Sequence, residues 1–149
     1  MALTSCLKFD YQAFPSVPNE AFPQKRIVVR PVITMRLFFN EKSVRSPALI
    51  DSGSDFCMFH AEIGELLGIN IRSGKKMVFM GTGGTPQHAY FHTVHYDIGG
   101  WNIQSYAGFS YEMKTMPYGL LGQTGFFNQF RIEFDYAKKR IEMKPKGGI

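Results

Sequence analysis

Apolar and polar residues alternate along several short stretches of the chain, and this period of two is typical of strands with one buried face. Residues 32–39 show it most clearly, because Ile33, Met35, Leu37 and Phe39 fall on one side. Comparable strands are expected at residues 27–29, 46–50, 76–80, 89–94, 93–98, 101–106, 131–134 and 140–143. The pattern therefore predicts an all-β fold, mainly β with one or two short helices.

Helical spacing is confined to two short segments. Residues 61–67 are expected as a helix that ends at Gly68, with Ile63, Leu66 and Leu67 at helical spacing. A second short helix is expected near residues 125–129, and a turn is expected at residues 41–45.

Residues 1–25 differ from the rest of the chain because they hold three of its eight prolines. A segment so rich in proline is expected to be extended, as an N-terminal arm. The domain itself is expected to comprise residues 26–149. Four aromatic side chains are expected to pack the arm onto it: Phe9, Tyr11, Phe14 and Phe22.

The composition is that of one globular domain. At 149 residues the chain is long enough to bury a core but too short for two full domains. Its hydrophobic content of 44%, with 14 Phe and 15 Gly, suits short strands joined by tight turns and excludes a disordered chain.

Charge and cysteine content exclude several classes of protein. The net charge is +5, but the basic residues fall at strand ends and turns without an RNA or DNA motif, so a solvated surface and no nucleic-acid partner are expected. Cys6 and Cys57 are too few for a disulfide framework or a zinc site. The first residues lack a signal-peptide core, and no run approaches the roughly 18 apolar residues of a membrane span. A soluble, cytoplasmic protein without a membrane partner is expected.

The clearest chemical signal is Asp51, which follows the apolar residues 48–50. An unpaired anion at the end of a buried strand takes up a proton or finds hydrogen-bond partners. Ser52 and Ser54 supply hydroxyl donors for Asp51 or its surroundings, and Gly53 allows a tight turn and the close approach of a ligand. This is the chemistry of an acid–base aspartate, although such tripeptides also occur in solvated turns.

Two further segments accompany Asp51-Ser52-Gly53. Residues 81–84, Gly-Thr-Gly-Gly, separate two expected strands and predict a hairpin with a mobile tip. Residues 120–122, Leu-Leu-Gly, precede a short aromatic stretch. In this order, over residues 31–130, the three segments resemble the single-domain retropepsin-like aspartic proteases. The resemblance implies a closed β-barrel with a flap hairpin that acts as a homodimer, and residues 120–122 as the brace of the catalytic loop.

The resemblance also implies roles for single residues. Asp51 falls on the catalytic aspartate, Ser52 on the hydroxyl residue that bonds across the dimer, and Gly53 on the glycine whose carbonyl meets substrate. Asp55 falls on the acidic residue that contacts the substrate main chain. The other implied substrate-binding residues belong to the flap tip and to apolar pockets: Gly81, Thr82, Gly83, Gly84, Leu49, Tyr118 and Leu120.

Peptide hydrolysis of this kind needs one carboxylate to activate water and another to protonate the substrate. The chain has five aspartates, and only Asp51 begins an Asp-[Ser/Thr]-Gly motif. The implied enzyme is an aspartic endopeptidase in which two Asp51 carboxylates, one from each subunit, activate a water without a metal or cofactor. Its implied partners are a second copy of the chain and a peptide or protein substrate.

Two positions depart from the retroviral pattern. Ser54 stands where alanine is usual, and we expect its hydroxyl to donate a hydrogen bond that favours the ionised Asp51 carboxylate. Gln123 stands where arginine is usual, which removes an expected charged partner of Asp55.

Alternatives stay open at this level. A non-catalytic peptide-binding or dimerisation module would keep the fold without activity. A metal-dependent hydrolase would use His88, His92 and His95, although a period of two places His95 on the other face of a strand. Met77 and Met80 are equally consistent with a substrate groove and with core packing.

Overall fold

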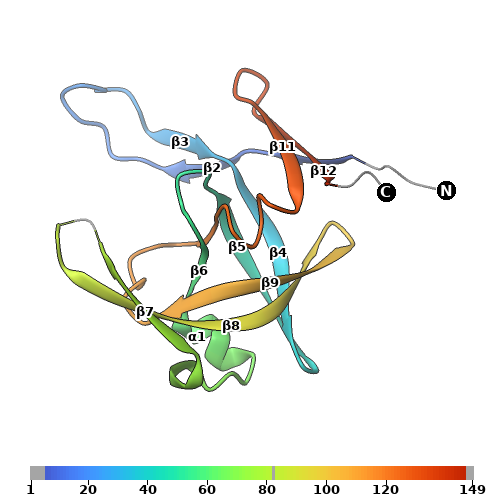
Figure 1. Ribbon diagram of the computed structural model, residues 1–149. Coiled ribbons are helices and arrows are strands. Elements are labelled where there is room, and N and C mark those ends of the chain that lie inside the picture. The colour runs from blue at the N-terminus through green and yellow to red at the C-terminus, as the bar shows by residue number, and fades with distance from the viewer. Residues whose placement is uncertain (1–5, 82, 147–149) are drawn as a thin grey trace.

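Six strands close into a barrel in Figure 1, the computed structural model of the chain, which describes residues 6–81 and 83–146. In order around the barrel, the strands are β4 (Val32–Phe39), β5 (Lys42–Ile50), β10 (Gly119–Leu121), β6 (Cys57–His60), β9 (Trp101–Ser110) and β8 (Pro86–Ile98). Pairing between β4 and β8 closes the circle, and β7 (Lys75–Met80) adds to β8 outside it. The expected closed, all-β barrel is confirmed.

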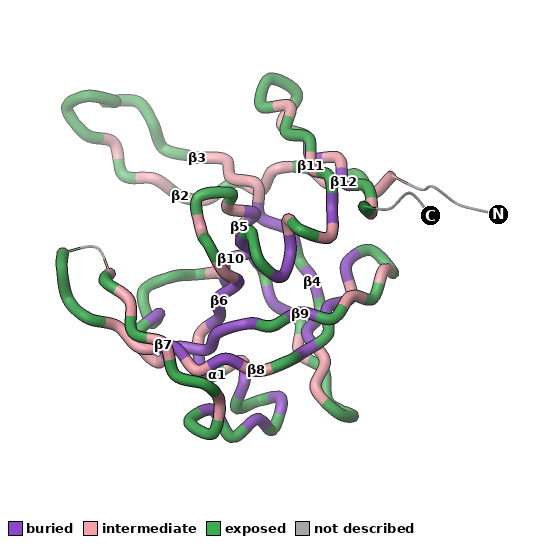
Figure 2. Tube along the Cα trace, in the orientation of Figure 1, coloured by how far each residue is buried: buried purple, intermediate pink, exposed green. Residues whose placement is uncertain are grey.

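The alternation of apolar residues decides which side of each strand faces the barrel interior. In β4, Ile33, Met35 and Leu37 are buried while Thr34 and Arg36 are exposed, as expected. Figure 2 shows the buried segments running through the strands. The largest side chains of the interior are aromatic: Phe59, Tyr96, Phe109 and Phe126. Because burial of one Phe contributes about 1.5–3 kcal/mol, this packed interior is the main source of stability.

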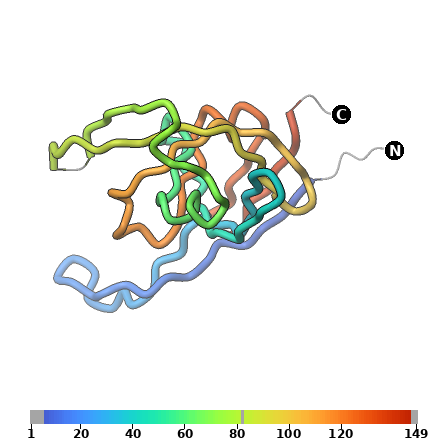
Figure 3. The backbone as a smooth tube through the Cα atoms, turned by 90° about the horizontal axis from the view of Figure 1, so that it is seen from below, coloured from blue at the N-terminus to red at the C-terminus, as the bar shows by residue number. Residues whose placement is uncertain are grey.

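In the described part of the N-terminal segment, two short stretches are paired strands. β1 (Leu7–Asp10) pairs with β12 (Arg140–Pro145), which pairs in turn with β11 (Phe130–Asp135) in a three-stranded sheet. β2 (Gln12–Pro15) and β3 (Ile27–Arg30) form a separate hairpin. The β2–β3 and β7–β8 hairpins project from the same side of the barrel (Figures 1 and 3).

The aromatic side chains of this segment pack only in part as expected. Phe9 and Tyr11 pack against the main core, and Phe14 is half-buried. Phe22 is 59% exposed, so the expectation is wrong there. Phe22 lies between β2 and β3, at the end of a hairpin that reaches away from the barrel and offers no core surface.

Within the described residues, helical structure is limited to α1 (Ala61–Leu66) and the 3-10 turn η1 (Ile71–Ser73). α1 confirms the expected helix. However, Leu66 is 63% exposed, because a helix of fewer than two turns buries one narrow stripe, here Ala61 and Gly64. No helix in the described ranges is long and apolar enough to cross a membrane.

Two strand boundaries differ from expectation. The turn expected at residues 41–45 lies earlier, because Asn40 takes a left-handed φ of 53° and β5 already begins at Lys42. The two strands expected within residues 89–98 are one strand, β8, which pairs without interruption with β9 from Tyr90 to Ile98.

The helix expected near residues 125–129 is wrong, because that segment forms turns. The N–H of Phe127 donates to the carbonyl of Gly122, five residues back rather than four, at 3.1 Å. Gly125 has a φ of 104°, which a helix does not accommodate. These turns lead the chain from the barrel into β11.

Candidate active site

Asp51 follows the last residue of β5, the strand that lies between β4 and β10 in the barrel. Its backbone N–H donates to the carbonyl of Leu121 at 2.9 Å. Its half-buried carboxylate accepts a hydrogen bond from the N–H of Gly53, with N and Oδ1 3.0 Å apart. A Cβ atom at Gly53 would lie 3.3 Å from that oxygen, so glycine leaves room around the carboxylate. Asp51 is a positioned acid rather than a residue of a freely solvated turn.

The Asp51 loop (residues 51–56) is shaped by its own hydroxyl and backbone groups. Ser54 Oγ donates to the carbonyl of Phe56 at 2.7 Å, so the expected bond from Ser54 to the Asp51 carboxylate is wrong. The backbone N–H of Ser54 donates to the Asp51 carbonyl at 3.1 Å and tightens the turn. Ser52 is exposed, where another molecule can reach it.

A second segment, residues 121–124, runs beside the Asp51 loop. The backbone N–H of Gln123 donates to the carbonyl of Ser54 at 2.9 Å. A Cβ atom at Gly122 would overlap the carbonyl oxygens of Ser54 and Phe56. Only glycine therefore permits this close approach, at the place where the resemblance puts the brace.

The side chain of Gln123 makes a further contact with the Asp51 loop. Its Nε2 donates to the carbonyl of Ser52 at 2.7 Å. In the sequence, position 123 stands out only because the retroviral pattern usually has arginine there. No local pattern signals a hydrogen bond between an amide and a backbone carbonyl 71 residues away.

A groove with a volume of 390 Å³ lies between the Asp51 loop and the β7–β8 hairpin. Three of the implied site residues line it, namely Gly53, Asp55 and Leu120. The other lining residues are largely methionine and phenylalanine: Ser54, Phe56, Met58, Met77, Phe79, Met80, Gln87, Met113 and Met116. Met77 and Met80 thus belong to a groove, and the contribution of Met113 and Met116 was missed because their segment shows no periodicity.

Leu49 and Tyr118 lie outside this groove. Leu49 is in register with Leu120 across the β5–β10 pairing. The ring of Tyr118 meets that of Phe14 edge-on, with centroids 5.6 Å apart, and the Arg30 guanidinium lies 5.6 Å from the Phe14 ring. Tyr118 therefore contacts the β2–β3 hairpin.

The tip of the β7–β8 hairpin is a turn built on glycine. Gly81 N donates to the carbonyl of Thr85, and Gly84 N donates to that of Gly81, both at 3.1 Å. Gly83 and Gly84 have φ values of 94° and 77°, which residues with a side chain rarely adopt. Thr82, implied as part of the tip, lies outside the described residues.

The three histidines of β8 make separate contacts. His88 Nδ1 lies 3.6 Å from the Glu112 carboxylate, His92 Nε2 lies 2.8 Å from the Ile71 carbonyl, and His95 is exposed. No group of three or more His, Cys, Asp or Glu side chains in residues 6–81 and 83–146 is arranged to hold a metal ion. The metal-dependent alternative therefore has no support from these residues.

Cys57 is the first residue of β6, directly after the Asp51 loop, and it is buried. Burial raises the pKa of its thiol. Its Sγ lies 3.7 Å from the Thr124 carbonyl. A neutral, buried thiol is a packing group rather than a nucleophile.

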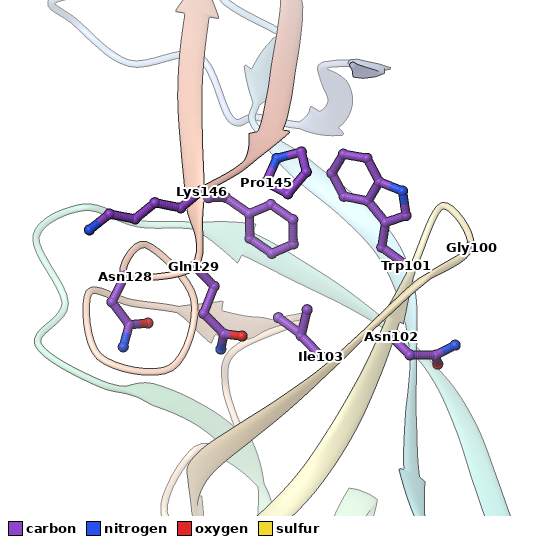
Figure 4. A pocket seen from close by; sticks show the side chains of 9 residues that line it. Gly100, Trp101, Asn102, Ile103, Asn128, Gln129, Pro145 and Lys146 are labelled. Atoms are coloured by element: carbon purple, nitrogen blue, oxygen red, sulfur yellow. The ribbon is translucent and has the colours of Figure 1, made fainter. Parts of the chain in front are cut away.

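A second pocket, with a volume of 610 Å³, lies between the start of β9 and the end of β12 (Figure 4). Trp101 stacks on Phe130 along one wall, with centroids 5.8 Å apart. Gln129 Nε2 donates to the Gln104 carbonyl at 3.0 Å and holds the adjoining turn to β9. Lys146 is the only titratable residue of its lining, so this pocket lacks the groups for hydrolysis.

Comparison with known proteins agrees with this geometry. The family described as Aspartyl protease matches residues 35–124. The crystal structure of a retropepsin-like aspartic protease from Rickettsia conorii is similar over 93% of this chain and 98% of that one, with a TM-score of 0.59 and 14% identity. EIAV protease complexed with the inhibitor HBY-793 is similar over 63% and 82% respectively, with a TM-score of 0.47 and 20% identity. No curated protein matches the chain. With a family match across the Asp51 loop, the groove and the brace, the chain belongs to the aspartyl protease family and has the retropepsin-like fold.

Proposed function

We propose that the protein is an aspartic endopeptidase in which two Asp51 carboxylates, one from each subunit of a homodimer, activate a water that attacks a peptide bond. The observation that carries this proposal is the half-buried residue Asp51 at the end of β5, whose backbone N–H and carboxylate each make one hydrogen bond to the backbone, beside an apolar groove. A hydrogen bond from an aspartate side chain to the N–H two residues on is common in turns, so the proposal depends on its combination with the groove and with the close approach of residues 121–124.

The chemistry requires a second carboxylate. Two close carboxylates share one proton, so one acts as base toward water while the other protonates the carbonyl oxygen and later the amine. One chain supplies one Asp51. A two-fold axis beside Asp51 brings the same residue of a second copy opposite it.

The groove suits a peptide with a large apolar side chain. Methionine side chains adapt to ligands of different shape, and five of them line it: Met58, Met77, Met80, Met113 and Met116. Leu120 completes the apolar wall, while Asp55 and Gly53 offer polar groups to the substrate main chain. Closure of the β7–β8 hairpin as a flap would bring Gly81, Thr82, Gly83 and Gly84 over the peptide and exclude water.

The strand edges limit where the partner can pair. The strand at residues 140–143 has no open edge for a partner, because β12 is paired on both sides, by β1 and by β11. The outer edges of that sheet belong to β1 and β11, and Ser52 is exposed on the Asp51 loop. We propose that the partner meets the chain through Ser52 and one of these edges.

A peptide-cleavage assay tests the proposal. Wild type incubated with a diverse peptide mixture should yield new termini, and Asp51→Asn should lower the rate by about 1,000-fold or more. Mixing wild type with excess Asp51→Asn subunits should reduce activity further than dilution does, because mixed dimers hold one functional carboxylate. If activity follows the amount of wild-type chain while labelled subunits exchange, the shared site is wrong. If wild type binds peptides and never cleaves them, the protein is a binding module.

A further inference from the structure

We propose that Gln123 is a positioning residue, which holds the Ser52–Gly53 peptide group in the orientation that directs its N–H at the Asp51 carboxylate. The expected effect on kcat rests on the proposed function, whereas the expected effect on the conformation of the Asp51 loop does not.

The two hydrogen bonds involved belong to one planar peptide group. The Ser52 carbonyl accepts from Gln123 Nε2 at 2.7 Å, and the N–H of Gly53 donates to Asp51 Oδ1 at 3.0 Å. In a trans peptide group the C=O and the N–H point to opposite sides, so fixing one direction fixes the other. A hydrogen bond accepted by the carbonyl also polarises the group and strengthens the bond that its N–H donates.

Other contacts hold the ends of the loop but leave this peptide group to Gln123. Two other carbonyls of the loop, those of Asp51 and Ser54, accept from the backbone N–H groups of Ser54 and Gln123 at 3.1 and 2.9 Å. Among the described residues, the hydrogen bond that reaches the Ser52 carbonyl comes from the Gln123 side chain. Gly53 lowers the barrier to rotation of the peptide group, so an external support matters here more than at another residue.

Gln123 is itself well placed to act as a support. Its backbone N–H is bonded to the Ser54 carbonyl, and its carbonyl accepts from the N–H of Asn128 at 3.1 Å. The side chain therefore leaves a backbone fixed on both sides, next to Gly122, where even an added Cβ atom would overlap the loop. The chain of contacts runs from this rigid segment through one side chain and one peptide group to the carboxylate.

Kinetics of isosteric variants test the inference. Gln123→Met keeps the length of the side chain and removes the donor, and kcat should fall by about 10- to 100-fold with little change in KM. The acidic limb of its pH–rate profile should move to higher pH, because the ionised carboxylate loses support. Gln24→Met, at an exposed position of the β2–β3 hairpin, is the matched control and should behave like wild type.

A second variant separates the hydrogen bond from packing. Gln123→Glu has the same shape but donates only when protonated, so its activity relative to wild type should recover as the pH falls toward the ordinary carboxyl pKa of about 4.3. A purely structural role for position 123 predicts no such recovery. Equal kcat and an equal acidic limb in wild type and Gln123→Met would overturn the inference.

Amide hydrogen exchange gives a readout that does not depend on cleavage. The Gly53 N–H should exchange at least about tenfold faster in Gln123→Met than in wild type, while amides of the barrel core keep their protection. Unchanged Gly53 exchange contradicts the inference even if the protein proves inactive. Failure of wild type to cleave peptides contradicts the proposed function alone.

Discussion

The Asp51 loop and the β7–β8 hairpin line the same groove, and both rely on glycine, but for different reasons. At Gly122, beside the loop, a Cβ atom would overlap the carbonyls of Ser54 and Phe56. At Gly83 and Gly84 nothing lies within 4 Å of such an atom, and the positive φ angles are what favour glycine. The loop is held by contacts with a second segment, whereas the described part of the hairpin tip is held by its own backbone hydrogen bonds and backbone conformation.

This difference matches the two tasks of the proposed mechanism. A carboxylate that activates water must stay fixed, because small displacements of reacting groups are costly to catalysis. A hairpin that closes over a peptide must move, and segments with few buried contacts open at low free-energy cost. The predictions below change each region in turn.

The largest effect is expected for Gly122→Ala. The added methyl group would push the Asp51 loop away from residues 121–124, so the free energy of unfolding should fall by about 3 kcal/mol and activity should be lost. Urea denaturation and the peptide-cleavage assay measure the two effects. Stability and activity close to wild type would show that the loop is not held by close approach.

Gly83→Ala should separate activity from stability. Forcing alanine into a left-handed conformation costs about 1 kcal/mol, so the free energy of unfolding should fall by about that amount, much less than for Gly122→Ala. We expect kcat/KM to fall by about tenfold, equivalent to about 1.4 kcal/mol, because the tip closes less readily. Full activity would place the flap elsewhere in the chain.

Oxidation should distinguish the exposed methionines of the groove from the buried ones. Met80 and Met116 are 66% and 37% exposed, whereas Met58 and Met113 are 6% and 7% exposed. Dilute peroxide should convert the first pair to polar sulfoxides and raise KM for apolar peptides by about fivefold, or about 1 kcal/mol of lost apolar contact.

The control for the oxidation experiment is the double variant Met80→Leu/Met116→Leu. It should keep its KM after the same treatment, with mass spectrometry reporting which residues are oxidised. An equal loss in the double variant would assign the effect to other methionines.

The smallest effect is expected for Ser54→Ala. The Ser54 hydroxyl donates to the Phe56 carbonyl, so its removal should lower the free energy of unfolding by about 1 kcal/mol. The acidic limb of the pH–rate profile should stay in place, since this hydroxyl does not bond to the Asp51 carboxylate. A shifted limb would restore the role that the sequence first suggested for Ser54.

The sequence by itself determined the elements with a repeating pattern and the residues with unusual chemistry. Alternation predicts β4 because a half-buried strand must place every second residue in the core. Asp51 is predicted because a carboxylate after buried residues needs partners. A turn near residues 81–84 is predicted because glycine accepts positive φ angles, as Gly83 and Gly84 do. These signals are local, so they can be recognised from neighbouring residues without knowledge of the fold.

Only the tertiary structure decided the contacts between distant segments. The bond from Gln123 to Ser52 spans 71 residues and has no periodic signature. The direction of the Ser54 hydroxyl depends on where the Phe56 carbonyl turns, and Met113 and Met116 reach the groove because of the path that the chain takes between β9 and β10. The edge-on contact of Tyr118 with Phe14 also joins residues that are far apart in the sequence. Side-chain contacts of this kind depend on how the elements pack, which the local propensities of the residues do not predict.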